Sequence, residues 1–245
     1  RQVTLRRELD VVSNNIANIN TTGFKANGAV FEEFIGRTAR QGDLSRRDAR
    51  VSFVRDRATW TDMSQGSLER TGNPLDVAVD GKGFMTVQTP NGERFTRNGA
   101  FQINNAGQLV TSEGYQVVGE NGPIAMQPTD RNISISADGT ISVREGDNVD
   151  TEALRGKLRL TSFADPGLLR KEGSSIFSAP DGVAPAADTV SRFVQDKKKK
   201  SNVNSVMEMT RMIEVTRAYT QIATMLSQQS DLQRTAVEKL ADVPN

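Results

Sequence analysis

Residues 5–25 read LRRELDVVSNNIANINTTGFK, and this stretch decides how the chain is organised. Its apolar residues recur at intervals of four, three, four and three positions, namely Leu5, Leu9, Val12, Ile16 and Ile19. This spacing is the narrow seam of a coiled coil, which suits one partner helix. Gly23 is a natural left-handed end for such a helix. We therefore predict a helix over residues 1–22 that needs a partner to bury its seam.

A second helical pattern lies near the other end of the chain. Its apolar track consists of Met212, Val215, Tyr219, Ile222, Leu226, Ala236 and Leu240. Neither glycine nor proline occurs between Val206 and Leu240, and good helix formers are frequent there. We predict a helix over residues 203–241, capped by Asn202 or Ser205. Two seams with little else to cover them indicate that the terminal helices pair as a coiled coil.

Between the two helical patterns, short alternating runs are separated by Asn-Gly and Asp-Gly pairs, which are strong hairpin signals. These pairs occur at Asp80-Gly81, Asn91-Gly92, Asn121-Gly122 and Asp138-Gly139. The expected fold class is α+β, with paired terminal helices and a central irregular antiparallel β domain. The expected boundaries are 1–35 and 201–245 for the helical domain, 36–69 for an extended linker arm, 70–190 for the β domain and 191–200 for a basic connector.

Composition argues against most catalytic chemistry. The 245 residues include no Cys and no His, which excludes thiolate nucleophiles, Ser-His-Asp triads and imidazole metal sites. Carboxylate-pair or lysine chemistry remains open, but no carboxylates stand in a diagnostic pattern. We predict no enzymatic activity, no catalytic residue, no cofactor and no metal. The net charge of +1 argues against nucleic acid as a partner, and no apolar run is long enough for membrane insertion.

Asparagine is concentrated where the first helix is expected to end. Asn14, Asn15 and Asn18 all precede Gly23, although Asn is a poor helix former. One explanation is local capping of free backbone carbonyls. The other is hydrogen bonding to another helix or subunit, which we favour because Asn14 and Asn18 share a face at i, i+4 spacing. The predicted assembly interface comprises Leu5, Leu9, Val12, Asn14, Asn15, Ile16, Asn18, Ile19, Met212, Val215, Tyr219, Ile222 and Leu226.

Four blocks, in chain order, resemble the flagellar axial family of rod, hook and hook-associated proteins. They are Ser13 to Lys25, Gly81-Lys82-Gly83-Phe84, Phe95 to Phe101, and Ser201 to Asn204 with Glu208-Met209 and Arg217-Ala218-Tyr219. The resemblance implies a structural subunit that polymerises through its terminal helices into the periplasmic rod of the basal body, with the β domain outside. It also implies three kinds of partner: copies of this chain, other rod proteins, and the type III apparatus that exports subunits unfolded.

Within that family, the length of 245 residues is short for a hook subunit and fits a rod protein. Residues 24–34 and 209–219 resemble the proximal rod member more than the distal one, which remains the alternative. A carbohydrate-binding or adhesive β module with a helical stalk is the alternative from another class. One departure from the family pattern is the run Asp196 to Lys200. Because adjacent like charges resist close packing, we expect these lysines to form a solvated connector away from the β domain.

Overall fold

The computed structural model describes residues 2–37, 50–145, 152–173 and 175–241. The chain divides into two compact units. The helical unit comprises Arg1–Ala17, Asn27–Trp60 and Asn204–Asn245, and the β unit comprises Asn18–Ala26 and Thr61–Val203. The chain therefore passes from one unit to the other after residues 17, 26, 60 and 203.

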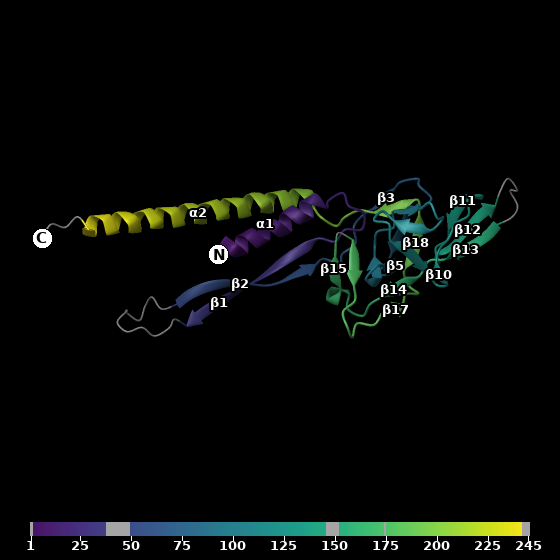
Figure 1. The fold of residues 1–245 in the computed structure, drawn as a ribbon, viewed down its shortest axis with the longest axis horizontal. Helices are drawn as coiled ribbons and strands as arrows, with labels where there is room; N and C mark the ends of the chain where they lie inside the picture. The colour runs from purple at the N-terminus through teal and green to yellow at the C-terminus, as the bar shows by residue number, and fades with distance from the viewer. Residues whose placement is uncertain (1, 38–49, 146–151, 174, 242–245) are drawn as a thin grey trace. The chain divides into compact units, whose positions relative to one another are not determined.

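The helical unit contains two helices and a two-stranded ribbon (Figure 1). Its elements are α1 (Gln2–Ala17), β1 (Asn27–Arg37), β2 (Arg50–Thr61) and α2 (Ser205–Ala241), with β1 paired to β2. Helix α1 packs against both α2 and β1. The prediction of one helix near each end of the chain is confirmed.

Both helix boundaries differ from the predicted ones. Helix α1 ends at Ala17 because the following residues form a turn, in which the backbone N–H of Thr21 donates to the carbonyl of Asn18 at 3.1 Å. At the start of α2, the Asn204 side chain accepts hydrogen bonds from the backbone N–H groups of Val206 (3.1 Å) and Met207 (3.3 Å). Asn204, rather than Asn202 or Ser205, therefore caps α2.

The predicted linker arm is more regular than expected. Strands β1 and β2 occupy much of residues 27–61, so the arm predicted over 36–69 and the helical domain predicted over 1–35 both contain strand. The ribbon could not be predicted from the sequence, because the adjacent charges Glu32-Glu33 interrupt the alternation of apolar and polar residues that indicates a half-buried strand. Residues 38–49 of the predicted arm and 242–245 of the predicted helical domain lie outside the described residues.

The β unit is built on an antiparallel sheet in the order β15-β16-β6-β5-β9-β8-β7. Three further strands branch from it: β10 pairs with β9, β14 pairs with β5, and β17 pairs with β14. A three-stranded sheet, β11-β12-β13, and two ladders, β4–β18 and β3–β19, complete it. A short 3-10 helix spans Pro166–Leu168. The strand bounds are β3 Leu68–Arg70, β4 Val77–Asp80, β5 Phe84–Thr89, β6 Gly92–Thr96, β7 Phe101–Ile103, β8 Leu109–Thr111, β9 Gln116–Gly119, β10 Gly122–Pro123, β11 Asp130–Ile135, β12 Thr140–Glu145, β13 Glu152–Lys157, β14 Leu160–Ser162, β15 Arg170–Glu172, β16 Ile176–Ser178, β17 Ala186–Ala187, β18 Arg192–Gln195 and β19 Lys197–Lys199. The predicted α+β class with an antiparallel centre is confirmed.

Three of the four predicted hairpins form, at Asn91-Gly92, Asn121-Gly122 and Asp138-Gly139. The prediction is wrong at Asp80-Gly81, because β4, which precedes this pair, is paired with β18 and not with β5. The Asn91-Gly92 pair turns β5 into β6, with Thr89 opposite Gly92 and a φ of 99° at that glycine. Gly139, between β11 and β12, has a φ of 90°, and a Cβ there would lie 2.6 Å from the Phe193 ring. Both positions require glycine for conformation, and the second requires it for space as well.

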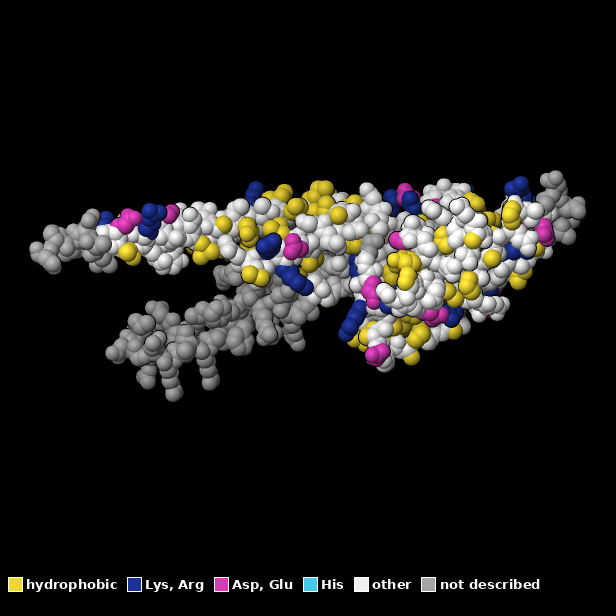
Figure 2. All heavy atoms as spheres, in the orientation of Figure 1, with side chains coloured by type: hydrophobic (Ala, Val, Ile, Leu, Met, Phe, Trp, Pro, Cys, Tyr) yellow, Lys and Arg dark blue, Asp and Glu magenta, His cyan; other side chains and the backbone are white. Residues whose placement is uncertain are grey.

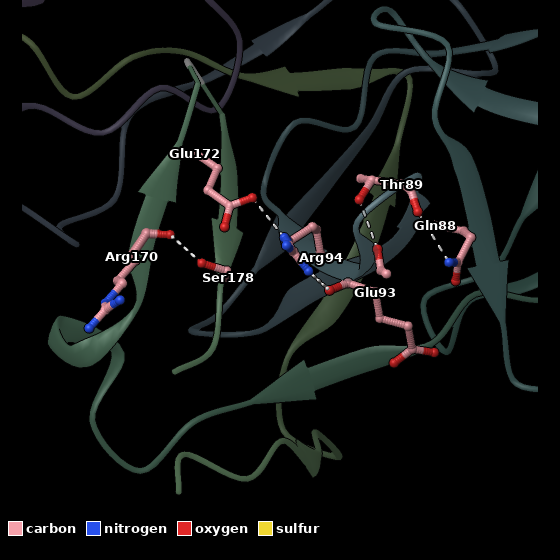
Figure 3. Close-up of polar contacts among 8 residues, drawn as sticks. Gln88, Thr89, Glu93, Arg94, Arg170, Glu172 and Ser178 are labelled. Atoms are coloured by element: carbon pink, nitrogen blue, oxygen red, sulfur yellow. Dashed lines mark hydrogen bonds and ion pairs between the residues drawn. The ribbon is translucent and has the colours of Figure 1, made fainter. Parts of the chain in front are cut away.

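Two apolar clusters fill the β unit. The larger one includes Val77 of β4, Phe101 of β7, Leu109 of β8, Ile141 of β12 and Leu158, which follows β13. The smaller one is aromatic and packs Phe84, Phe95, Phe163 and Phe177 edge to face. Beside it, Arg94 of β6 reaches Glu172 of β15, with 2.8 Å between Nε and Oε2 (Figure 3). The hydrogen bond from Arg94 holds the pKa of the Glu172 carboxyl below its usual range.

The lysine run is a strand and not a solvated connector. Strand β19 pairs with β3, placing Lys198 opposite Glu69. Because side chains alternate along a strand, Lys198 and Lys200 reach the Glu69 carboxylate at 3.9 and 3.2 Å, while Lys199 is buried on the other face. Alternation separates charges that are adjacent in the sequence, so the expected repulsion does not prevent this segment from packing on the β unit.

Candidate assembly site

Helices α1 and α2 pack against each other, and one apolar residue of the predicted interface is buried on each of them, Val12 and Val215. An ion pair of 2.9 Å between Glu8 and Arg211 joins the same two helices. The other hydrophobic positions of the predicted interface are less covered. Leu5, Leu9, Ile16, Tyr219 and Ile222 are half-buried, Met212 and Leu226 are exposed, and Ile19 is half-buried in the β unit.

Helix α2 is much longer than the helix beside it. It has 37 residues and α1 has 16, so at about 1.5 Å per residue α1 can accompany less than half of its length. Exposed large apolar side chains on α2 are Val206, Met207, Met209, Met212, Ile213, Met225, Leu226, Leu232 and Val237. Figure 2 shows hydrophobic side chains at the surface along the helices. Exposed apolar surface on this scale is typical of an interaction site.

Asn15 is the buried member of the asparagine tract, with 1% of its surface exposed. Its Nδ2 donates to the carbonyl of Asn27 at 2.8 Å, and its Oδ1 accepts from the backbone N–H of Asn27 at 2.9 Å. The pair of hydrogen bonds ties the last turn of α1 to the first residue of β1. Asn14 is the residue before Asn15, and its side chain points about 100° away from that of Asn15 around the helix axis. It is exposed.

Asn14 and Asn18 do not share a helix face, because α1 ends at Ala17. The Oδ1 of Asn18 accepts a hydrogen bond from the hydroxyl of Thr21 at 3.1 Å, within the turn that follows the helix. This contact is local, but it joins two side chains and does not cap a free backbone carbonyl. A role for Asn14 between subunits stays a prediction.

A cluster that the sequence analysis missed surrounds residues 62–65 in the β unit. We call its three members, Lys25, Arg97 and Lys199, the cationic clamp; each is at most 2% exposed. Their ends donate hydrogen bonds to this segment: Lys25 Nζ to Ser64 O, Arg97 Nη1 to Met63 O (3.3 Å) and Lys199 Nζ to Gln65 Oε1. Isolated Lys and Arg residues in a sequence ordinarily indicate solvated surface, so no sequence pattern predicted that these three side chains are buried together.

Asn202 continues the same network. Its Oδ1 accepts from the backbone N–H of Ala26 at 2.7 Å, and its Nδ2 donates to the carbonyl of Asp62 at 2.8 Å. The backbone N–H of Gly23 donates to the carbonyl of Lys199 at 2.7 Å. Together with the clamp, these bonds join three segments of the β unit that lie next to the chain crossings after residues 26, 60 and 203.

Burial makes the clamp electrostatically unfavourable when it is fully charged. Burial, with added repulsion from Arg97 and Lys199, lowers the pKa of Lys25 to about 7. Burial and then Arg97 lower the pKa of Lys199 to about 8, and burial lowers the pKa of Arg97 to about 10. The carboxylates that act on these cations are Asp62 on Lys25, Asp80 on Lys199 and Asp188 on Arg97.

We expect the clamp to make the β unit more stable in mild alkali. The folded pKa of Lys25 is about 7 and its unfolded value about 10.5, so between these values the unfolded chain binds more protons. The free energy of unfolding should therefore rise with pH in this window, by at most about 1.4 kcal/mol per pH unit for each such lysine. Hydrogen exchange of amides in β4, β5 and β6 of the full chain, at pH 7 to 10 and corrected for intrinsic rates, measures this rise.

Lys25→Met should flatten that rise, because it removes the group with the largest shift. Lys157→Met is the matched control. Lys157 is paired with Glu120 at 3.0 Å, and that hydrogen bond raises its pKa, so its loss should leave the alkaline rise in place. An identical slope in Lys25→Met and wild type would contradict the role given to the clamp.

Among the residues that the structure describes, no helix is both long and apolar enough to cross a membrane. Within the same residues, no group of three or more acidic side chains is placed to hold a metal ion.

Comparison with known proteins gives three family matches along the chain. Residues 2–25 match the flagella basal body rod protein family, residues 78–143 the flagellar hook protein FlgE/F/G D1 domain, and residues 199–239 the flagellar basal body rod FlgEFG protein C-terminal family. The matched ranges contain α1, most strands of the central and three-stranded sheets, and nearly all of α2.

Whole proteins show the same relationship. The chain is 37% identical to the flagellar basal-body rod protein FlgF of Caulobacter vibrioides, over 99% of this chain and 96% of that protein. It is 35% identical to FlgF of Mesorhizobium japonicum, over 98% of this chain and 94% of that one. It is also 35% identical to the rod protein FlgG of Buchnera aphidicola, over 86% of this chain and 85% of that protein. The chain therefore belongs to the flagellar basal-body rod protein family and is a structural subunit of the rod.

Proposed function

We propose that this chain is the proximal, FlgF-type subunit of the rod and acts in it as a packing element, without enzymatic activity or a cofactor. The observation that carries this role is the exposed apolar surface of α2, which extends beyond the reach of α1. Apolar surface on a long amphipathic helix is covered when helices of several subunits pack together. The near full-length match to two FlgF proteins, compared with 86% coverage for FlgG, supports the FlgF type.

In this proposal α1 and α2 pair as a coiled coil, and the pair packs against helices of copies of this chain and of other rod proteins. The predicted interface, from Leu5 to Ile19 and from Met212 to Leu226, supplies the contacts. The surfaces that meet differ on the two partners, so the association does not close and extends as a helical polymer. The type III export apparatus is the remaining partner. A chain without cysteine suits transport in the unfolded state, because no disulfide can form on the way.

Locating the chain in intact basal bodies tests this function. A copy with an epitope tag in the β unit replaces the native protein, and electron microscopy of antibody-decorated basal bodies gives the tag's position along the rod. We expect the tag on the half of the rod nearest the inner membrane, in cells that swim. Labelling along the outer half would support the distal, FlgG-type alternative. Normal rods without the tagged chain would contradict a rod function altogether.

A further inference from the structure

A groove in the helical unit lies between the start of α2 and the side of α1, and it has a volume of about 570 Å³. Its apolar walls are Val206, Met207 and Val215. Its charged walls carry three carboxylates, Glu8, Glu208 and Glu214, against one arginine, Arg211. The groove therefore combines apolar surface with a negative charge excess.

The one arginine is already engaged. Arg211 donates to the Glu8 carboxylate at 2.9 Å through Nε and approaches the same oxygen at 2.9 Å through a terminal nitrogen. In contrast, Oε2 of Glu208 is buried and has no hydrogen-bond partner among the described residues. A carboxylate oxygen withdrawn from water without a donor is unfavourable. Glu208 therefore lacks a hydrogen-bond donor, and a cationic donor would also offset the negative charge excess of the groove.

A role at the helix terminus does not explain this oxygen. Glu208 lies in the first turn of α2, where a negative charge is favourable. However, the side chain of Asn204 already accepts from the free N–H groups of Val206 and Met207. These two N–H groups are capped without Glu208, so helix capping does not account for its unpaired oxygen.

The outer side of α1 has the complementary character. Val3 is 81% exposed there, and Arg6 is also exposed. Within one chain, Arg6 points away from α2, because Glu8 faces α2 and residues two apart on a helix lie on different sides. Arg6 cannot reach the groove of its own chain from that side, although it can reach the groove of a neighbour.

We infer that the groove at Glu208 receives the outer side of α1 from a second copy of this chain, with Arg6 donating to the Glu208 carboxylate and Val3 meeting the apolar walls. Arginine suits this position because its planar fork matches a carboxylate. The groove and the outer side of α1 are different surfaces of one chain, so each copy can use both at once and the contact propagates. This inference rests on the proposed function and names one of its contacts.

Cysteine cross-linking tests the contact directly, because the chain has no cysteine of its own. Two full-length copies with different tags, one Arg6→Cys and one Glu208→Cys, are co-expressed, and isolated basal bodies are oxidised under mild conditions. A disulfide between the two tags can only join different copies. We expect a cross-linked dimer that carries both tags. The matched control replaces the Arg6→Cys chain with Arg234→Cys, another exposed arginine, and should give no dimer.

Charge exchange gives a second readout. Glu208→Arg and Arg6→Glu should each lower incorporation at least tenfold, and the two changes in one chain should restore it. Incorporation of both tagged copies without a cross-link would overturn the inference while leaving the rod function intact. Loss of incorporation in Glu208→Arg that Arg6→Glu does not rescue would also overturn it, because the occupant would then be a different rod protein. If tagged copies without any substitution were absent from the rod, this result would contradict the proposed function and not only this contact.

Discussion

Val12→Asp is expected to abolish incorporation of this chain into the rod. Val12 is 1% exposed on α1, the helix that packs against α2. The substitution loses about 1.5–3 kcal/mol of apolar burial and places a carboxylate at a position that is withdrawn from water. We expect this loss of several kcal/mol to separate α1 from α2, because a short helix is only marginally stable without its partner. Rod protein in isolated basal bodies, with swimming on soft agar, measures the outcome.

A matched valine shows whether position or charge causes the loss. Val190 is 86% exposed in the β unit, so Val190→Asp adds the same carboxylate in water and should incorporate normally. Val12→Ala should lie between wild type and Val12→Asp, because it removes packing without burying a charge. Immunoblots of whole cells exclude reduced synthesis as the cause. If cells with Val12→Asp chains built normal rods and swam, the proposed pairing of α1 and α2 would be contradicted.

Asn15→Ala is expected to destabilise the helical unit by about 1–3 kcal/mol, since it removes both hydrogen bonds to the backbone of Asn27. The loss stays within this range because Asn27 is half-buried and water can replace part of the bonding. The better helix propensity of alanine offsets only a few tenths of a kcal/mol of this loss in stability. Hydrogen exchange of the α1 and β1 amides, compared with wild type, reports the change.

The adjacent residue provides the control. Asn14→Ala alters the same residue type one position earlier, on the exposed side of α1, so protection of α1 and β1 should be retained or slightly increased. If Asn14 contacts another subunit, as the sequence predicts, incorporation should fall in this variant although the helical unit stays folded. Equal loss of protection in the two variants would contradict the separate roles given to Asn14 and Asn15.

Much of the architecture could be read from local patterns. Hydrophobic spacing identified both terminal helices, because burial along one stripe imposes a period on the sequence. Three of the four Asn-Gly and Asp-Gly pairs identified hairpins, because positive φ values restrict which residues can stand there. The ribbon of β1 and β2 was missed because its sequence does not alternate. Its pairing depends on backbone hydrogen bonds, to which every residue type except proline contributes equally.

The sequence by itself determined the class of protein: terminal helices that need partners, a hairpin-rich centre, and a chain without the residues of most catalytic sites. Only the tertiary structure decided which polar groups are buried. Lys25, Arg97 and Lys199 come from three distant segments, and the fold of the β unit brings them together around residues 62–65. Likewise, Asn15 rather than Asn14 is the structural asparagine because of where β1 begins. Periodicity records which side of an element is buried, but the partner of a buried polar atom is set by contacts between segments far apart in the chain.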